Sequence, residues 1–212
     1  MPTRPTLCIG SSSKWRLRIL SNVFDHEFDI LQCPPEIDEK AIRRSSAEEL
    51  TVAIAEAKLD AVIKHHRSQG RALPTVILTS DQVAVFNGEI REKPVDPEEN
   101  YRFLEDYSEN AVTTVAGWAV FHSATKSKAF GTHSCTTHFG AISRAVAERV
   151  VSRGDSLQCC GGFVIEDVDL ASQIKYIENG SVASVQGVHV PLVQRLLLQV
   201  NSDSEVFCDR PA

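Results

Sequence analysis

Apolar runs and amphipathic stretches alternate along the chain, a pattern that predicts strands interleaved with helices. The apolar run at residues 6–9 predicts a buried strand, and residues 14–22 carry apolar side chains at helical spacing. A longer helix is predicted from Ser46 to about His66, because Ser46 and Glu49 have the spacing of a capping box and apolar residues recur on one face. We therefore expect the strand at residues 6–9 and both helices to contribute apolar side chains to a packed core.

A run of uncharged β-formers at residues 75–79 predicts a central strand that is buried on both faces. We expect that strand to end at the polar residues 80–82, which places Asp81 at a strand terminus. A buried strand that ends on a carboxylate is a common way to present that group to a ligand.

The dipeptide Asn87-Gly88 is the strongest short hairpin signal in the chain, and it predicts that residues 83–86 pair with residues 89–92. If the pairing is extended by one position, the Lys93 ammonium lies beside Asp81. The sequence thus predicts a carboxylate and an ammonium at the same end of the buried strand.

The remaining pattern continues the alternation of strands and helices. It predicts a helix that opens at residues 96–99, strands at 112–122 and 129–139, a helix at 141–153, strands at 163–166 and 173–177, and a closing helix at 191–200. We infer an α/β fold, a mixed twisted sheet with flanking helices. Residues 1–212 would form a single domain that could curl into two lobes around a deep cleft.

Composition and charge narrow the class of protein. Of 212 residues, 42% are hydrophobic and 24% charged, which excludes a disordered chain or a coiled coil. The 22 basic and 28 acidic residues give a net charge of −6, which argues against nucleic acid or an anionic membrane as a partner. An anionic ligand would therefore need a local basic cluster.

Six cysteines, with no C-x-x-C pair among them, predict neither a disulfide framework nor a zinc site, and they suit a reducing cytoplasm. No run reaches the ~20 apolar residues of a membrane helix. The basic N-terminal segment also has the composition of a transit peptide, but the predicted strand and helix account for it better. We expect a cytoplasmic protein.

The turn at residues 10–14 is a candidate anion site, since it lies between a predicted strand and a predicted helix. The hydroxyls of Ser11 and Ser13, the helix N-terminus, and the charges of Lys14 and Arg16 could hold a phosphate together. A serine-rich turn with no ligand is the competing interpretation.

Lys58 falls at the border of the apolar face of the long helix, where its stem can be buried and its ammonium can reach a cleft. Taken alone, a lysine with a buried stem and a solvated head is the commoner case. Asp81, with further acids at residues 36–39, would suit a hard Mg²⁺ ion beside a phosphate cradle.

These residues, taken in order, resemble the Maf family of nucleoside triphosphate pyrophosphatases. That family carries a first motif of the form L-A-S-x-S-P-[RW]-R-x-x-L-L, which residues 9–20 follow with Lys14 in place of proline. The resemblance implies a Maf/ITPase-like fold and a homodimer. It extends over nearly the whole chain, through residues 35–39, 55–58, 80–83, 92–94, 107–108 and 160–163.

The resemblance also implies a role for each matching residue. Ser11, Arg16, Lys58 and Lys93 would contact the triphosphate, and Glu39 and Asp81 would serve a divalent metal ion and the attacking water. Asp81 would accept the proton, and the reaction would convert a nucleoside triphosphate and water into a nucleoside monophosphate and diphosphate.

Three positions bear on the nucleobase. Family members resembling pyrimidine-triphosphate enzymes have Arg, Thr and Gln where this chain has Trp15, Gln82 and Glu166, whereas the subgroup acting on 7-methyl-GTP resembles this chain at all three. N7-methylation makes guanine cationic, so a tryptophan face attracts it, and a carboxylate can accept both N–H groups of the base edge. Core packing for Trp15 and a solvated strand position for Glu166 are the competing readings.

Two further hypotheses remain open at this stage. The enzyme could act on dTTP, UTP or another pyrimidine nucleotide instead. The chain could also be a non-catalytic binder of nucleotides or methylated caps, although such a binder has no need of a general base at Asp81.

Overall fold

The computed structural model describes residues 4–201, which form two compact units. The first unit contains the residues up to Asp81, Ala116–Thr132 and the residues from Val188, and the second contains Gln82–Val115 and His133–Gly187. The chain therefore passes between the units four times. None of the helices described here is long and apolar enough to cross a membrane.

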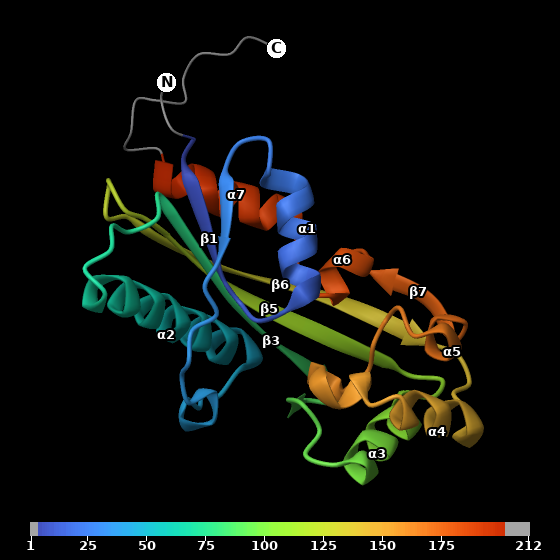
Figure 1. Cartoon of the computed structure of the whole chain (residues 1–212). Helices are drawn as coiled ribbons and strands as arrows, with labels where there is room; N and C mark the ends of the chain where they lie inside the picture. Colours follow the sequence, from blue (N-terminus) through green and yellow to red (C-terminus); the bar gives the residue numbers. More distant parts are fainter. Residues whose placement is uncertain (1–3, 202–212) are drawn as a thin grey trace. The chain divides into compact units, whose positions relative to one another are not determined.

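One mixed sheet runs through the chain, and its hydrogen-bonded order is β2-β1-β3-β5-β6-β7, with β4 paired to β3 (Figure 1). β2 and β3 run parallel to β1, whereas β4 and β7 run antiparallel to their neighbours. β3, β5 and β6 each begin in one unit and end in the other. The strands are β1 (Thr6–Gly10), β2 (Asp29–Gln32), β3 (Val76–Phe86), β4 (Glu89–Arg91), β5 (Ala111–His122), β6 (Lys128–Phe139) and β7 (Ile174–Glu178).

Side-chain caps set the starts of the longer helices. Ser13, Ser46, Asp96 and Ser143 each accept a hydrogen bond from a backbone N–H in the first turn. The α-helices are α1 (Lys14–Phe24), α2 (Ala47–Ser68), α3 (Pro97–Tyr107), α4 (Arg144–Ser152), α5 (Val168–Ala171), α6 (Val182–Val185) and α7 (Val190–Asn201), with 3₁₀ turns at Glu39–Ala41, Asp155–Gln158 and Cys160–Gly162.

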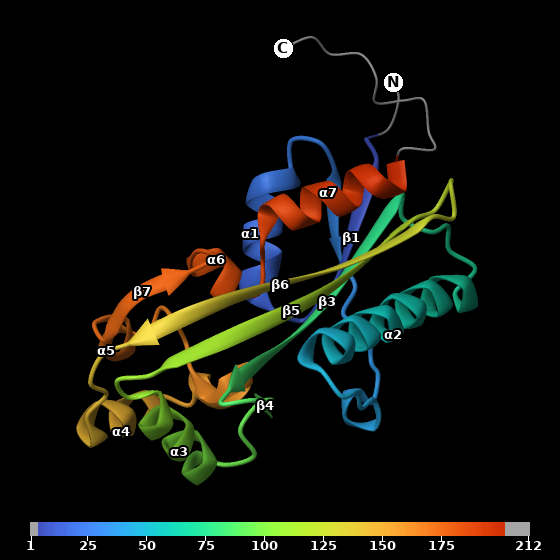
Figure 2. The same cartoon turned by 180° about the vertical axis from the view of Figure 1, so that it is seen from behind.

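In the first unit, helices cover both faces of the sheet (Figures 1 and 2). α1 and α7 pack on one face, where Leu20 and Leu196 meet Ile9 and Trp118. α2 packs on the opposite face, against the other side chains of β1 and β3. This is why β1 and β3 read as uninterrupted apolar runs: both of their faces are buried.

α2 approaches β5 more closely than a side chain would allow. A Cβ added to Gly117 would lie 2.4 Å from the carbonyl carbon of Thr51 and 2.5 Å from the backbone nitrogen of Val52. Backbone therefore packs on backbone here, and the absence of a side chain at residue 117 fixes how deeply α2 sits on the sheet of this unit.

The core of the second unit contains a cluster of aromatic rings. Tyr107 packs against Phe86, Phe139 and Phe163, and its hydroxyl donates a hydrogen bond to the carbonyl of Gly161. The buried guanidinium of Arg91 stacks over three rings, including Tyr107. These contacts join α3 to the loop that follows α4.

The sequence predicted the fold class correctly, and the mixed sheet with flanking helices is confirmed. The hairpin register is also correct, since Phe86 pairs with Glu89 and Ala84 with Arg91. Two local predictions are wrong. β3 does not end at residues 80–82 but continues to Phe86, and residues 163–166 form a turn instead of a strand.

Candidate active site

The serine turn between β1 and α1 is tightly structured. The Ser11 hydroxyl accepts a hydrogen bond from the Ser13 N–H at 3.2 Å, and the Ser13 hydroxyl accepts from the Arg16 N–H as the cap of α1. The Gln32 amide of β2 donates to the Ser11 carbonyl at 2.9 Å. The turn is therefore held from both sides, with Ser11 buried and Lys14 exposed.

The first turn of α1 presents a cation and an aromatic ring. The Arg16 guanidinium donates to the Ser80 carbonyl of β3 at 3.4 Å, which directs its charge toward the strand that carries Asp81. Trp15 is 37% exposed, and the Arg18 guanidinium lies 4.7 Å from its ring centroid. Trp15 is thus not a core residue: it is an exposed ring that already binds a cation.

Lys58 of α2 is the centre of a charge cluster in the first unit. Its Nζ lies 2.8 Å from Oδ1 of Asp81 and 2.8 Å from Oε1 of Glu39, and it also donates to the Ser80 carbonyl at 3.4 Å. The side chains of Lys58 and Asp81 are each 11% exposed, whereas Glu39 is 46% exposed. Helix, strand and 3₁₀ turn therefore bring one ammonium and two carboxylates together.

Local hydrogen bonds fix the three elements that meet at this cluster. The Thr79 hydroxyl of β3 donates to the Ala55 carbonyl of α2 at 2.6 Å, one helical turn before Lys58. Asp38 caps the 3₁₀ turn by accepting from the Ala41 N–H, which orients Glu39. Asp81 lies inside β3, between the segment that pairs with β1 and the segment that pairs with β4.

The donor set suits a hard divalent ion. Asp81 and Glu39 offer carboxylate oxygens within reach of the same nitrogen, and Mg²⁺ or Mn²⁺ is commonly held by one or two carboxylates, substrate phosphates and water. The half-exposed position of Glu39 leaves an approach for such an ion. These residues therefore fit the metal that the sequence led us to expect.

Three further predicted site residues belong to the second unit. The Gln82 amide donates to the Val185 carbonyl at 3.0 Å, so that amide secures the C-terminal end of α6. Lys93 is exposed and lies beyond β4, which ends at Arg91, so it is not part of the hairpin ladder. The extended pairing of Gln82 with Lys93 is therefore wrong.

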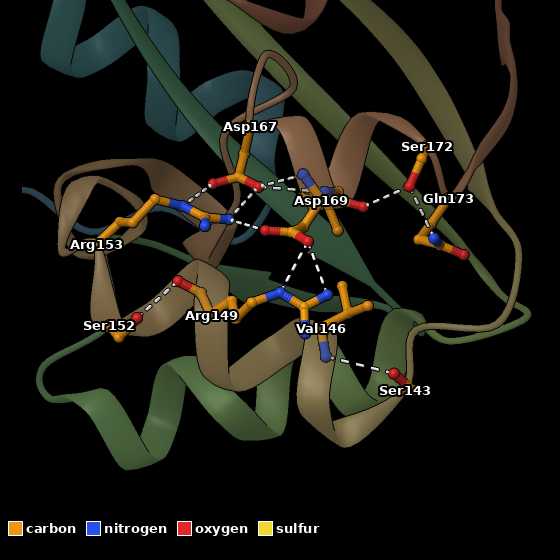
Figure 3. A network of polar contacts seen from close by, with 10 residues as sticks. Ser143, Val146, Arg149, Ser152, Arg153, Asp167, Asp169, Ser172 and Gln173 are labelled. Atoms are coloured by element: carbon orange, nitrogen blue, oxygen red, sulfur yellow. Dashed lines mark hydrogen bonds and ion pairs between the residues drawn. The ribbon is translucent and has the colours of Figure 1, made fainter.

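Glu166 is half-buried in the turn before α5, and the residues that follow it are held by arginines (Figure 3). Arg153 donates twice to Asp167, at 2.7 and 2.6 Å, and Arg149 donates to Asp169 at 2.8 Å. Arg153 also lies 2.8 Å from Asp169. Asp167 in turn caps α5, so the network fixes the turn that carries Glu166.

Sequence reasoning did not identify this network. Arg153 lies at the end of a predicted helix and Asp167, 14 residues later, just after the predicted strand 163–166, and neither belongs to a motif. A second unpredicted group consists of Cys8, Cys33 and His66 in the first unit. Only the packing of α2 on β1 brings these three together, and no spacing in the sequence reveals it.

Comparison with known proteins gives a consistent result. The Maf-like protein family matches residues 6–200. The chain is 34% identical to a 7-methyl-GTP pyrophosphatase of Dictyostelium discoideum, over 95% of this chain and 100% of that protein.

Two bacterial proteins of the same name are similar over comparable lengths. The 7-methyl-GTP pyrophosphatase of Pseudomonas aeruginosa is 29% identical over 92% of this chain and 96% of its own, and that of Vibrio cholerae is 28% identical over 95% and 97%. Among solved structures, protein VC0702 from Vibrio cholerae aligns over 71% of each chain with a TM-score of 0.35 and 10% identity, too low to indicate a shared fold.

Proposed function

Because the chain belongs to the Maf-like protein family, we propose that it is a metal-dependent nucleoside triphosphate pyrophosphatase that prefers 7-methyl-GTP or a related modified nucleotide. It would release a nucleoside monophosphate and diphosphate, and so clear noncanonical nucleotides. The observation that supports this most directly is the convergence of Lys58 on Asp81 and Glu39, beside an arginine and a serine turn suited to phosphate.

In this proposal Asp81 accepts a proton from the water that attacks the α-phosphorus. Lys58, 2.8 Å from Oδ1, holds that carboxylate in place, and the in-line attack requires no covalent intermediate. Arg16 and Lys93 neutralise the charge that develops on the departing diphosphate, and the Ser11 and Ser13 turn, with Lys14, orients the phosphate chain.

Asp81 and Glu39 are the residues that would hold the divalent ion, Mg²⁺ or Mn²⁺. When bound, such an ion polarises phosphate oxygens and lowers the pKa of coordinated water. Lys58 lies within reach of both carboxylates, so it would shift toward the phosphates as substrate and metal arrive. We therefore expect the metal ion and the nucleotide to bind together.

We propose that Trp15, Gln82 and Glu166 select the base. The Arg18 guanidinium over the exposed Trp15 ring supports this, because a cation has access to the ring face and a methylated guanine is a cation. Glu166 would accept both N–H groups of the guanine edge, and its turn is fixed by Arg153 through Asp167. Gln82 would act from the interior of β3, where it directly follows Asp81.

We further propose that the protein acts in the cytoplasm as a homodimer, with no nucleic-acid partner and no membrane partner. The acidic excess supports the absence of nucleic acid and anionic lipid, because both attract basic surfaces. The dimer follows from the family resemblance, and sedimentation of the purified protein would test it.

The deciding experiment is a panel of normal and modified triphosphates, assayed for diphosphate release with Mg²⁺, with Mn²⁺ and with chelator. We expect the highest kcat/KM with 7-methyl-GTP and no turnover in chelator. Asp81→Asn should lower kcat by about 10²–10⁴-fold, the usual contribution of a general base. Asp60→Asn, a change of an exposed acid on the same helix as Lys58, is the matched control and should keep wild-type kcat.

Two results would contradict the proposal in different ways. A higher kcat/KM for dTTP or UTP than for 7-methyl-GTP would assign the chain to pyrimidine nucleotides and remove the argument from Trp15 and Glu166. Tight calorimetric binding of 7-methyl-GTP without diphosphate release, in the presence of metal, would identify a non-catalytic binder.

A further inference from the structure

Two cysteines and a histidine meet inside the first unit, on the face of the sheet that α2 covers. Cys8 lies in β1 and is fully buried, Cys33 directly follows β2, and His66 lies in the last turns of α2. One ligand atom from each lies within 4.8 Å of the others, and Sγ of Cys33 is 3.7 Å from Nε2 of His66. These side chains come from three different elements.

The local structure explains this meeting. β1 and β2 are parallel with Cys8 opposite Leu31, so Cys33, two residues farther along, projects from the same face as Cys8. The Cys33 N–H donates to the Ile9 carbonyl and continues the ladder beyond β2. α2 then lays Leu59, Val62 and His66 over that face, with an imidazole where apolar side chains surround it.

The spacing matches a tetrahedral ion. With Zn–S near 2.3 Å and Zn–N near 2.0–2.1 Å, tetrahedral ligands stand about 3.8 Å apart for two sulfurs and about 3.6 Å apart for sulfur and nitrogen. The Cys33–His66 distance of 3.7 Å already has the second value. We propose that Cys8, Cys33 and His66 bind one Zn²⁺ ion, at a site separate from the carboxylates of the candidate active site.

Donor chemistry separates the two sites. Thiolates and imidazole select zinc and similar soft ions, whereas Asp81 and Glu39 offer only the oxygens that Mg²⁺ and Mn²⁺ prefer. Three protein ligands leave one position for water, and the half-buried Cys33 provides the approach from solvent. The zinc site is therefore independent of the proposed catalytic function.

His66 is an unusual residue at a core position. Its Nδ1 is buried and has no hydrogen-bond partner among residues 4–201. Its other ring nitrogen, Nε2, faces Sγ of Cys33 at 3.7 Å, so Nε2 is the atom that would bind the ion.

Zinc would join β1, β2 and α2 at one point. Cys8 is two residues from Gly10, which opens the serine turn, and His66 is eight residues from Lys58 on the same helix. An ion here would stabilise the elements that position Ser11 and Lys58 without touching either. Zinc should therefore raise the midpoint of thermal unfolding, with or without nucleotide.

The test uses the full-length, reduced protein and metal alone. Titration with Co²⁺, a spectroscopic substitute for Zn²⁺, should produce a thiolate-to-cobalt charge-transfer band that saturates at one equivalent and disappears when Zn²⁺ is added. Cys33→Ser and His66→Gln should each weaken zinc binding, measured in competition with a chelator, by about 10–100-fold or more, because loss of even an outer-shell partner costs that much metal affinity.

Matched controls come from the same segments. His65→Gln changes the exposed neighbour of His66, and Cys159→Ser removes a thiol of the second unit; both should bind zinc like wild type. The proposal is overturned if no charge-transfer band appears, if it survives in Cys33→Ser, or if purified protein carries a Cys8–Cys33 disulfide that reduction does not convert into a zinc site. Because Cys33 is only half-buried, a folded Cys33→Ser protein is expected, and circular dichroism verifies it.

Discussion

Each unit contains a network in which cations meet carboxylates, and the two networks differ in burial. In the first unit, Lys58 and Asp81 have side chains that are only 11% exposed. In the second, the cations are more exposed, 52% for Arg149 and 36% for Arg153, whereas their partners Asp169 and Asp167 are 19% and 9% exposed (Figure 3). Similar charges are thus paired in two dissimilar environments.

This difference separates chemistry from scaffolding. Removing an ammonium and a carboxylate from water costs more than their attraction usually returns, so a buried pair is weak support for stability. A network whose arginines stay in contact with solvent costs less, and here it fixes the turn that carries Glu166. The Lys58–Asp81 pair is therefore best explained by what it does to a ligand, and the arginine network by what it does to the chain.

The largest expected effect comes from replacing the buried pair by apolar residues. The double variant Lys58→Met with Asp81→Val should lose diphosphate release to background. Its free energy of unfolding should match or exceed that of wild type, by up to about 1–4 kcal/mol. Urea denaturation and the diphosphate assay measure the two quantities on one sample. A double variant several kcal/mol less stable than wild type would make the pair structural and break the comparison.

The next largest effect is expected when only one member of the buried pair is removed. Lys58→Met alone leaves the buried Asp81 carboxylate unpaired, so it should lower the free energy of unfolding by about 3–5 kcal/mol. Chemical denaturation measures the free energy of unfolding of the single variant and of the double variant under the same conditions. Lys64→Met, at an exposed position of the same helix, is the control and should change little. Equal free energies of unfolding for the single and double variants would show that the buried Asp81 carboxylate costs no stability when it lacks an ionic partner.

The smallest effect is expected in the arginine–aspartate network of the second unit, and it depends on pH. Hydrogen bonds from Arg149, and then from Arg153, lower the pKa of Asp169 below its ordinary 3.8. The stability that this carboxylate contributes is therefore present above pH 3.8 and is lost as the pH falls through the lowered pKa. Asp169→Asn should be slightly less stable than wild type at neutral pH.

The stability gap between Asp169→Asn and wild type should close below pH 3.8, and at neutral pH it should shrink in high salt, which screens exposed charges. Denaturation series over pH and salt measure both trends. The Lys58→Met defect should persist in the same salt series, because a buried pair is screened much less. A salt response of equal size in both variants would remove the distinction between the networks.

Much of the fold follows from local pattern. The capping serine before α2, the Asp96-Pro97 start of α3 and the Asn87-Gly88 hairpin each have a cause within a few residues, and each was predicted. The helical period also put Lys58 at the border of the apolar face of α2, but its contact with Asp81 of β3 became visible only in the structure.

The errors concern positions at which tertiary contacts override local signals. Polar residues 80–82 suggested a strand end, yet β3 continues through them because Lys58 pairs with Asp81 and Gln82 binds the α6 backbone. The run at 163–166 has strand composition, but Phe163 packs on Tyr107 and the chain turns. The Cys8, Cys33 and His66 cluster was beyond prediction, since it depends on the register of β1 with β2 and on where α2 lies.

The contact of Gly117 with the α2 backbone offers a means of adjusting the candidate active site from a distance. A methyl group at residue 117 would push β5 and α2 apart, because it would lie only 2.4 Å from the carbonyl carbon of Thr51. The helix would have to lift, and it carries Lys58 with it. The span between an ammonium and a carboxylate would then depend on a residue that touches neither, and directed evolution could alter that span without changing any charged group.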